Sequence, residues 1–302
     1  MLRAYSNFVL PIGIAAIFAA SFGLRQGTLA ERVPRARDAG PPVRIVSLAP
    51  SATEVLFAIG AGDRMVGVTR FCKYPPEAQT KTSIGGFMDT NYEAIVALRP
   101  DLVVLLAIHG TAKDRLEALG VSTLEMDHRT LDGILGSIRT AGEVIGAEAA
   151  ANALIADIES RLDAVSKAVE GADRPRVLLS SGRTPGPLTV VYAAGKNQWY
   201  DDVIRLAGGE NAYSNITIQF PDLSAEGVLR LGPDVIVELA PDLPELGVDA
   251  AEFIRDWDTL AQIPAVHGKR VHVLTEGYGT IPGPRFVDLV EDLARLLHPE
   301  RP

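Results

Sequence analysis

Apolar and polar positions change their spacing repeatedly along this chain. Short runs rich in valine, isoleucine and leucine predict strands at residues 44–48, 66–69, 102–106, 122–126, 177–180, 188–192, 234–239 and 271–274. Between them, apolar residues recur every three or four positions and predict helices at residues 53–59, 92–98, 112–119, 199–207, 225–231, 251–260 and 286–297. Strands that alternate with helices build parallel sheets covered on both faces. The pattern therefore predicts an α/β fold with one parallel sheet in each half of the chain.

One long segment in the middle breaks this alternation. No proline occurs from residue 132 to residue 169, apolar residues recur at helical spacing, and Gly171 then supplies a stop signal. A continuous helix over residues 139–169 would be about 45 Å long, more than one lobe needs, and a kink near Gly142 or Gly146 is the alternative. We expect this helix to be a rigid strut between two lobes. The expected boundaries are 43–131 for the first lobe, 132–171 for the linking helix and 172–302 for the second lobe.

The two halves contain a matching segment. Residues 93–104 (EAIVALRPDLVV) and 226–237 (EGVLRLGPDVIV) align without gaps at an offset of 133 residues, and each is typical of a short helix, a Pro-Asp turn and a buried strand. Each copy begins with a glutamate, Glu93 or Glu226, two positions after a good helix N-cap residue. An acidic residue there stabilises the helix dipole by about 0.3–1 kcal/mol. Because both halves have one, we favour a second interpretation, in which the glutamates are exposed docking charges for arginines of a partner.

The first thirty residues have the layout of a secretory signal peptide. Arg3 precedes a mainly apolar run at residues 8–24, and residues 28–30 (TLA) resemble a small-x-small cleavage site. The alternative is an uncleaved membrane anchor, for which the run is short. We expect export to the periplasm and removal of residues 1–30, followed by a flexible tether at residues 31–42.

Charge and cysteine content exclude several classes of function. The chain carries a formal charge of −9, and removal of Arg3 and Arg25 with the leader takes it to −11, which argues against a DNA or RNA partner. The single cysteine, Cys72, excludes an internal disulfide and a cysteine-rich metal site. The sequence has no P-loop, no G-x-S-x-G, no H-E-x-x-H and no dinucleotide-binding glycine pattern after the first strand. We therefore expect a monomeric binding protein that is not an enzyme and carries no cofactor.

Candidate ligand contacts lie in the loops that follow strands, where open α/β folds bind ligands. Pro50 and Ser51 follow the first strand. Ser51 or Thr53 suits a helix N-cap, and backbone N–H groups there suit acidic or amide groups of a ligand. Phe87 and Met88 follow two glycines, and Phe220 precedes the second copy of the repeat. Side chains in such loops line a pocket for a flat macrocycle, or they fasten the loop to the core. The sequence leaves both roles open.

Histidine and tyrosine residues offer candidate ligands for a bound metal. His109 ends a predicted strand and precedes a glycine, so it is placed to ligate iron or cobalt, although single histidines are more often surface or core residues. His128, Tyr192, Tyr213 and Tyr278 are weaker candidates of the same kind. No two of these residues have a spacing that defines a metal site.

Several segments in order resemble one family of transport proteins. They are residues 44–54 (RIVSLAPSATE), 72–78 (CKYPPEA), 92–102 (YEAIVALRPDL), 206–211 (LAGGEN) and 263–271 (IPAVHGKRV). Together they resemble the solute-binding components of ABC importers for cobalamin, iron–siderophore and haem, over residues 43–297. The resemblance implies two α/β lobes joined by a rigid helix (class III), a ligand held between the lobes with little hinge closure, and a permease with its ATPase as partners. It also implies docking through one glutamate per lobe, at the positions of Glu93 and Glu226.

The resemblance leaves the ligand open. Residues 74–78 look most like the cobalamin-binding branch, which lines its cleft with aromatic residues. Phe87 and Phe220 stand at two places where tryptophan is familiar, and a third place, near Leu106, has no aromatic residue. Haem or a ferric siderophore therefore stays an alternative, and a haem binder would offer tyrosine or histidine as axial ligand, such as His109 or Tyr278. Outside this family, the alternatives are a two-lobed α/β enzyme or a scaffold protein without a permease.

Overall fold

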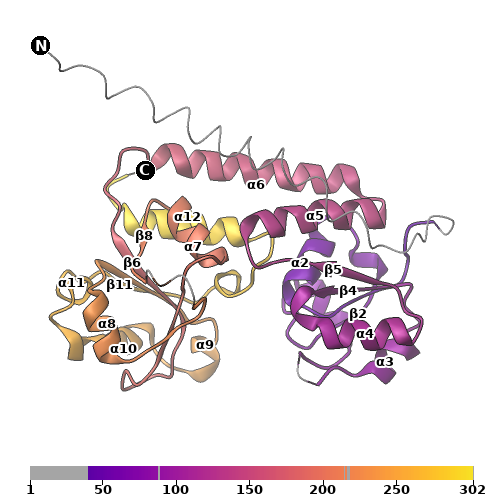
Figure 1. The fold of residues 1–302 in the computed structure, drawn as a ribbon, viewed down its shortest axis with the longest axis horizontal. Helices are drawn as coiled ribbons and strands as arrows, with labels where there is room; N and C mark the ends of the chain where they lie inside the picture. Colours follow the sequence, from indigo (N-terminus) through magenta and orange to yellow (C-terminus); the bar gives the residue numbers. More distant parts are fainter. Residues whose placement is uncertain (1–39, 88, 214, 216–217, 302) are drawn as a thin grey trace, which may run out of the picture. The chain divides into compact units, whose positions relative to one another are not determined.

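The computed structural model describes residues 40–301, except residues 88, 214, 216 and 217. The expected signal peptide at residues 1–30, nearly all of the expected tether and the candidate ligand contact Met88 lie outside the described residues. From Pro41 onward the chain folds into two α/β lobes below a pair of helices, in the orientation of Figure 1. The predicted two-lobed α/β class is confirmed.

The first lobe is built on a parallel sheet with the strand order β3-β2-β1-β4-β5. Its strands are β1 (Ile45–Ser47), β2 (Met65–Val68), β3 (Thr82–Ser83), β4 (Leu102–Leu106) and β5 (Thr123–Met126). The central strands β1 and β4 are buried along nearly their whole length, as a sheet covered on both faces requires. Because all five strands run in one direction, their carboxyl ends share one edge of the sheet.

Helices cover both faces of this sheet. They are α2 (Pro50–Ala58), α3 (Tyr92–Ala97), α4 (Gly110–Ala118) and α5 (Leu131–Ile145), with 3-10 turns at Gly62–Arg64, Pro76–Thr80 and Ala107–His109. Ile45 of β1 packs with Leu56 of α2 and Ile134 of α5 on one face. The next residue, Val46, points to the other face and packs with Ile95 of α3. The alternation of side chains along β1 thus divides the apolar core of this lobe into two layers.

The second lobe is built on a mixed sheet, so the prediction of parallel strands holds for only part of it. Its order is β11-β10-β6-β7-β9, with β8 also paired to β6. Its strands are β6 (Arg176–Gly182), β7 (Val191–Ala193), β8 (Glu210–Asn211), β9 (Asp222–Leu223), β10 (Val235–Leu239) and β11 (Val271–Leu274). β6, β8, β10 and β11 are parallel, whereas β7 is antiparallel to β6 and to β9. Only residues 183–190 connect β6 to β7; this is too short for a crossover helix, and the chain turns back as a hairpin.

The helices of the second lobe also lie on both faces of its sheet. They are α7 (Trp199–Leu206), α8 (Ala225–Leu231), α9 (Leu243–Leu246), α10 (Ala250–Arg255), α11 (Pro264–His267) and α12 (Phe286–Leu297), with 3-10 turns at Asp256–Leu260 and Gly277–Gly279. Val235 of β10 packs with Phe286 of α12 on one face, and Ile236 packs with Val228 and Trp257 on the other. Among the described residues, no helix is both long and apolar enough to cross a membrane.

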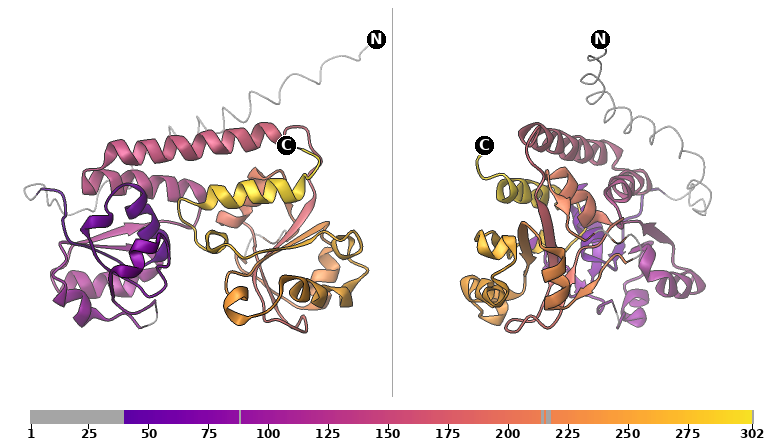
Figure 2. Two further views of the ribbon diagram at one scale, coloured as in Figure 1. Left: turned by 180° about the vertical axis from the view of Figure 1, so that it is seen from behind. Right: turned by 60° about the vertical axis from the view of Figure 1, so that its left-hand side comes forward.

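The segment predicted as one helix over residues 139–169 is a hairpin of two helices, α5 and α6 (Glu148–Ala168). Gly146 ends α5 in the left-handed conformation, with φ +70°, which glycine adopts without strain and which reverses the chain. The prediction of a continuous helix is wrong, and the break lies at one of the two glycines considered for a kink. α6 alone runs from the first lobe to the second, as the views in Figures 1 and 2 show.

Two glycines of α5 allow a test of how closely α5 packs against α6. A Cβ atom on Gly142 would lie 2.5 Å from the Ala151 side chain, whereas one on Gly136 would meet no atom within 4 Å. Alanine is a better helix former than glycine, so Gly136→Ala should raise the free energy of unfolding by about 0.5–1 kcal/mol. Gly142→Ala should instead lower it by about 1–3 kcal/mol because of overpacking. Urea denaturation measures both, and equal stabilisation by the two variants would contradict the hairpin packing.

Candidate functional site

The two lobes meet through segments that follow their strands. α9 follows β10, and the Glu245 carboxylate on it lies 2.6 Å from the Lys73 ammonium, in the segment after β2. The segment after β11 reaches α2, where the Arg285 guanidinium pairs with the Glu54 carboxylate. The carboxyl ends of β2, β10 and β11 thus lie on the facing sides of the two lobes (Figure 1). This is the place where open α/β folds bind their ligands.

Large apolar side chains are exposed in several segments that follow or precede strands of the two lobes. Phe87, which is 47% exposed, follows β3, and Phe220, which is 53% exposed, precedes β9. The others are Phe71 and Tyr74 after β2, Ile108 after β4, Ile218 before β9 and Leu246 in α9. A single exposed apolar side chain is ordinary, whereas exposed apolar side chains in the strand-end segments of both lobes are the kind of surface that a large apolar ligand would bind.

The Phe220 segment contacts a stretch of the second lobe that itself bonds to the first lobe. The Gly195 N–H donates to the Gln219 carbonyl at 2.7 Å, next to Phe220. Four residues after Gly195, the Trp199 N–H donates to the Arg129 carbonyl of the first lobe at 2.9 Å. The segment that carries Phe220 is therefore held close to the junction of the lobes.

In the first lobe, Phe87 lies edge-on against His109, with the ring centroids 4.9 Å apart. His109 is buried, and its Nδ1 accepts a hydrogen bond from the Leu106 backbone N–H at 3.0 Å. Burial lowers the pKa of His109, so the ring is neutral at neutral pH. Its Nε2 is buried and has no hydrogen-bond partner among the described residues. With Nδ1 as acceptor the ring proton is on Nε2, and metal ligation requires that this proton leave and that neighbouring side chains move aside.

Ser51 and Pro50 occupy the start of α2. Pro50 is the first helical residue, for which its fixed φ is suited, and the N-cap is Ala49 without a side-chain hydrogen bond. The prediction of Ser51 as an N-cap is therefore wrong. Its hydroxyl is buried and lies 2.9 Å from Nδ1 of His128, so in this arrangement the side chain is not open to a ligand. A ligand contact through the backbone of this turn stays a prediction.

Tyr278 lies in the turn after β11, where its hydroxyl donates a hydrogen bond to the Asp292 carboxylate on α12. Burial and this carboxylate raise the pKa of Tyr278, which opposes the phenolate form that ligates iron. The geometry thus fastens Tyr278 to α12 and does not favour it as an axial ligand. Among the described residues, no group of three or more His, Cys, Asp or Glu side chains is placed to hold a metal ion.

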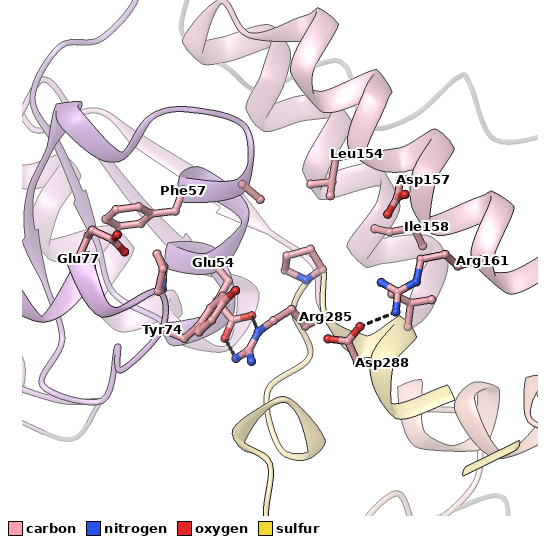
Figure 3. A pocket seen from close by; sticks show the side chains of 14 residues that line it. Glu54, Phe57, Tyr74, Glu77, Leu154, Asp157, Ile158, Arg161, Arg285 and Asp288 are labelled. Carbon is pink, nitrogen blue, oxygen red and sulfur yellow. Dashed lines mark hydrogen bonds and ion pairs between the residues drawn. The ribbon is translucent and has the colours of Figure 1, made fainter. Parts of the chain in front are cut away.

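The junction of the lobes contains an ion pair between a buried carboxylate and a partly buried guanidinium. The Arg285 guanidinium donates to both Glu54 oxygens, at 2.6 and 2.9 Å, and stacks on the Tyr74 ring at 3.7 Å from its centroid (Figure 3). Burial raises the pKa of Glu54, and the bonds from Arg285 oppose this shift. Because Glu54 is on α2 of the first lobe and Arg285 precedes α12 of the second, the pair joins the two lobes.

A hollow of about 550 Å³ lies beside this ion pair, as Figure 3 shows. It is bounded by α2, the Tyr74 segment, α6 and the start of α12. On its far side the Arg161 guanidinium of α6 pairs with Asp288 of α12 at 2.6 Å. The charged groups around this hollow are largely paired with each other, and the exposed aromatic rings Phe87 and Phe220 are not part of its wall. Of the exposed apolar side chains described above, Tyr74 alone borders the hollow, which is otherwise apart from the candidate ligand contacts.

Charged side chains near the exposed aromatic residues are also paired. The Arg70 guanidinium binds Asp89 through two hydrogen bonds of 2.7 and 2.8 Å, and it flanks the Phe71 ring. Lys73 binds Glu245 of the other lobe. These pairs neutralise the basic groups next to the aromatic rings.

Sequence reasoning missed the buried pair of Glu54 and Arg285 and the role of Tyr74. A signal for Glu54 was present, because a glutamate within an apolar helix segment needs a partner when it is buried. The identity of that partner was not readable, since 231 residues separate Glu54 from Arg285.

Comparisons with known proteins agree with this architecture. A family model described as periplasmic binding protein matches residues 45–278. A protein named cobalamin-binding protein from Halobacterium salinarum is 32% identical over 267 residues, which cover 85% of this chain and 70% of the relative.

Solved structures with the same fold include binding proteins for different ligands. The periplasmic vitamin B12 binding protein BtuF of Vibrio cholerae has a TM-score of 0.73 at 26% identity, covering 86% of this chain and 98% of that one. The periplasmic heme-binding protein RhuT from Roseiflexus sp. RS-1 has a TM-score of 0.73 at 29% identity, covering 86% and 99%. The similarity therefore includes both corrinoid and haem binders.

The buried contact of His128 generates a pH prediction. Burial lowers its pKa from 6.5 to about 4, so between these values the unfolded chain binds a proton that the folded chain does not. The stability from neutral His128 is present above pH 6.5 and is lost as the pH falls toward 4. Wild type should lose about 3 kcal/mol more than His128→Asn between pH 7 and 4, measured by urea denaturation. The exposed control His267→Asn should follow wild type, and a His128→Asn profile identical to wild type would contradict the burial effect.

Proposed function

The chain belongs to the periplasmic binding protein family, and we propose that within it this protein captures a corrinoid between its two lobes and delivers it to an ABC permease. Substrate-binding proteins of ABC transporters bind small ligands and work with a permease and its ATPase. The family and the named relatives are binding proteins and not enzymes. Family membership points to a periplasmic or extracellular location. Cleavage of residues 1–30 as a signal peptide, and a monomeric state, are part of this proposal.

The observation that carries the choice of ligand is a set of exposed aromatic rings whose neighbouring cations are already paired. Phe87 and Phe220 offer apolar surface from opposite lobes. Arg70 lies against the Phe71 ring and Arg285 against the Tyr74 ring, and Asp89 and Glu54 neutralise them. Lys73 is paired with Glu245. A corrinoid is large, and its edge carries neutral amide groups, so it matches apolar surface without unpaired charge. A haem with two carboxylates, or an anionic siderophore, gains most from free cations. The cobalamin-binding names of the relatives point the same way.

A haem or ferric siderophore is the second candidate, and one observation favours it. His109 is neutral, lies against the exposed Phe87 ring and has a buried Nε2 without a hydrogen-bond partner among the described residues. A neutral imidazole is a good ligand for haem iron. The haem-binding relatives of the same fold keep this alternative open.

Titration decides between these ligands. Residues 31–302 should bind cyanocobalamin with one-to-one stoichiometry in a calorimeter, and haemin and a ferric hydroxamate more weakly. Phe87→Ala and Phe220→Ala should each weaken corrinoid binding about tenfold to a hundredfold, because each ring loses buried contact area. Leu119→Ala, at an exposed position in the first lobe away from the strand ends, is the control and should bind as wild type. If haemin alone binds tightly, and His109→Ala abolishes that binding, the proposed ligand is haem and not a corrinoid.

Delivery to the permease generates a separate prediction. Glu93 on α3 and Glu226 on α8 are both exposed, one on each lobe, and neither belongs to the strand-end segments with the exposed aromatic rings. Charge reversal in Glu93→Lys with Glu226→Lys should abolish ligand uptake by cells, because the arginines of a permease would meet lysines. Ligand affinity measured on the purified variant should stay that of wild type. Loss of ligand binding in the double variant would assign the glutamates to the ligand site instead.

A further inference from the structure

The repeat in the sequence is also a repeat in the structure, down to single hydrogen bonds. The Asn91 side chain caps α3 by accepting from the Ala94 N–H at 2.9 Å. The Ser224 side chain caps α8 by accepting from the Gly227 N–H at 3.2 Å. Both pairs of equivalent residues lie at the repeat offset of 133 residues. The two helices therefore begin in the same way.

The C-terminal ends of α3 and α8 accept equivalent hydrogen bonds. The Arg44 guanidinium donates to a carbonyl at the end of α3 at 2.7 Å, and the Arg176 guanidinium donates to the equivalent carbonyl of α8 at 2.6 Å. The Asp101 carboxylate accepts from the Arg44 backbone N–H at 3.0 Å, as Asp234 accepts from Arg176 at 2.8 Å. Each lobe thus fixes a short helix against its central strand through the same set of contacts. The outer face of α3 in the first lobe therefore corresponds to the outer face of α8 in the second.

The two outer faces carry the same pair of side chain types. Val96 is three residues after Glu93, and Leu229 is three residues after Glu226, so each apolar side chain lies beside its glutamate on the helix surface. Val96 is 44% exposed and Leu229 is 36% exposed. A single exposed apolar residue needs no explanation, but the same exposure at equivalent positions of both repeats is not expected of two unrelated surface positions.

We propose that Val96 with Glu93, and Leu229 with Glu226, form two matching contact patches for the permease, in which the apolar side chain contributes to binding alongside the charge. This inference rests on the proposed delivery to an ABC permease. An apolar side chain next to a glutamate excludes water from the ion pair with a permease arginine and strengthens it. The partner surface is accordingly an arginine beside an apolar side chain, presented once to each lobe.

Binding to the permease–ATPase complex of the same organism, reconstituted in lipid nanodiscs and measured by surface plasmon resonance, tests the proposal. Val96→Gln and Leu229→Gln should each raise the Kd about three- to tenfold, and together more, through loss of apolar contact. Leu119→Gln is the matched control: it is 57% exposed on the first lobe, and its repeat-equivalent position is Glu252. This control, and the ligand affinity of all variants, should remain at the wild-type value.

Salt dependence separates the apolar contribution from the charge. Glu93→Gln with Glu226→Gln should flatten the dependence of Kd on ionic strength, whereas Val96→Gln with Leu229→Gln should raise Kd and keep the wild-type slope. If the glutamate variants lose binding while the apolar variants bind like Leu119→Gln, the inference is wrong and the proposed docking role stands. If neither pair of variants changes binding, the docking role of the two helices fails as well.

Discussion

The ion pair between Glu54 and Arg285 is the contact on which the arrangement of the two lobes depends most. The Glu54 side chain is buried and Arg285 is partly buried, so removal of Arg285 would leave the Glu54 carboxylate buried and unpaired, a change that typically costs about 3–5 kcal/mol in a fully buried pair. The pair fixes α2 of the first lobe against the start of α12 of the second. The ion pair of Arg161 with Asp288 holds α6 on α12. α12 therefore contacts the linking helix α6 and also begins next to the Glu54–Arg285 pair.

This constraint bears on the cost of binding at the proposed ligand surface. When the lobes are already held in place, a ligand that enters between them orders few side chains, and less of its binding free energy is lost. The exposed rings of Phe87 and Phe220 supply apolar area, and the pairing of Arg70 with Asp89 leaves the adjacent surface without an uncompensated cation. The exposed bridge from Lys73 to Glu245 contributes little to stability, since surface ion pairs are worth about 0–1 kcal/mol.

Periodicity and the internal repeat predicted the class, the two lobes and most elements, because each depends on short-range spacing of apolar residues. β4, α8, β11 and α12 have the predicted bounds. The hairpin of α5 and α6 was mispredicted because Gly146 tolerates both a helix and a left-handed turn, and the close approach of Gly142 to Ala151 that selects the turn is tertiary. The exposed positions of Phe87 and Phe220 follow from their place in strand-end loops. The hydrogen-bond partners of Ser51, Tyr278 and Glu54 lie at least 14 residues away in the chain, so the local sequence pattern does not predict them.

The position of the bound ligand is the central claim, and a crystal structure of residues 31–302 grown with cyanocobalamin tests it most directly. We predict density for the corrinoid between the strand ends of the two lobes, with Phe87 on one side and Phe220 on the other, and with the Glu54–Arg285 pair intact. Density in the hollow beside that pair, among Tyr74, Arg161 and their neighbours, would contradict the assignment of the ligand surface.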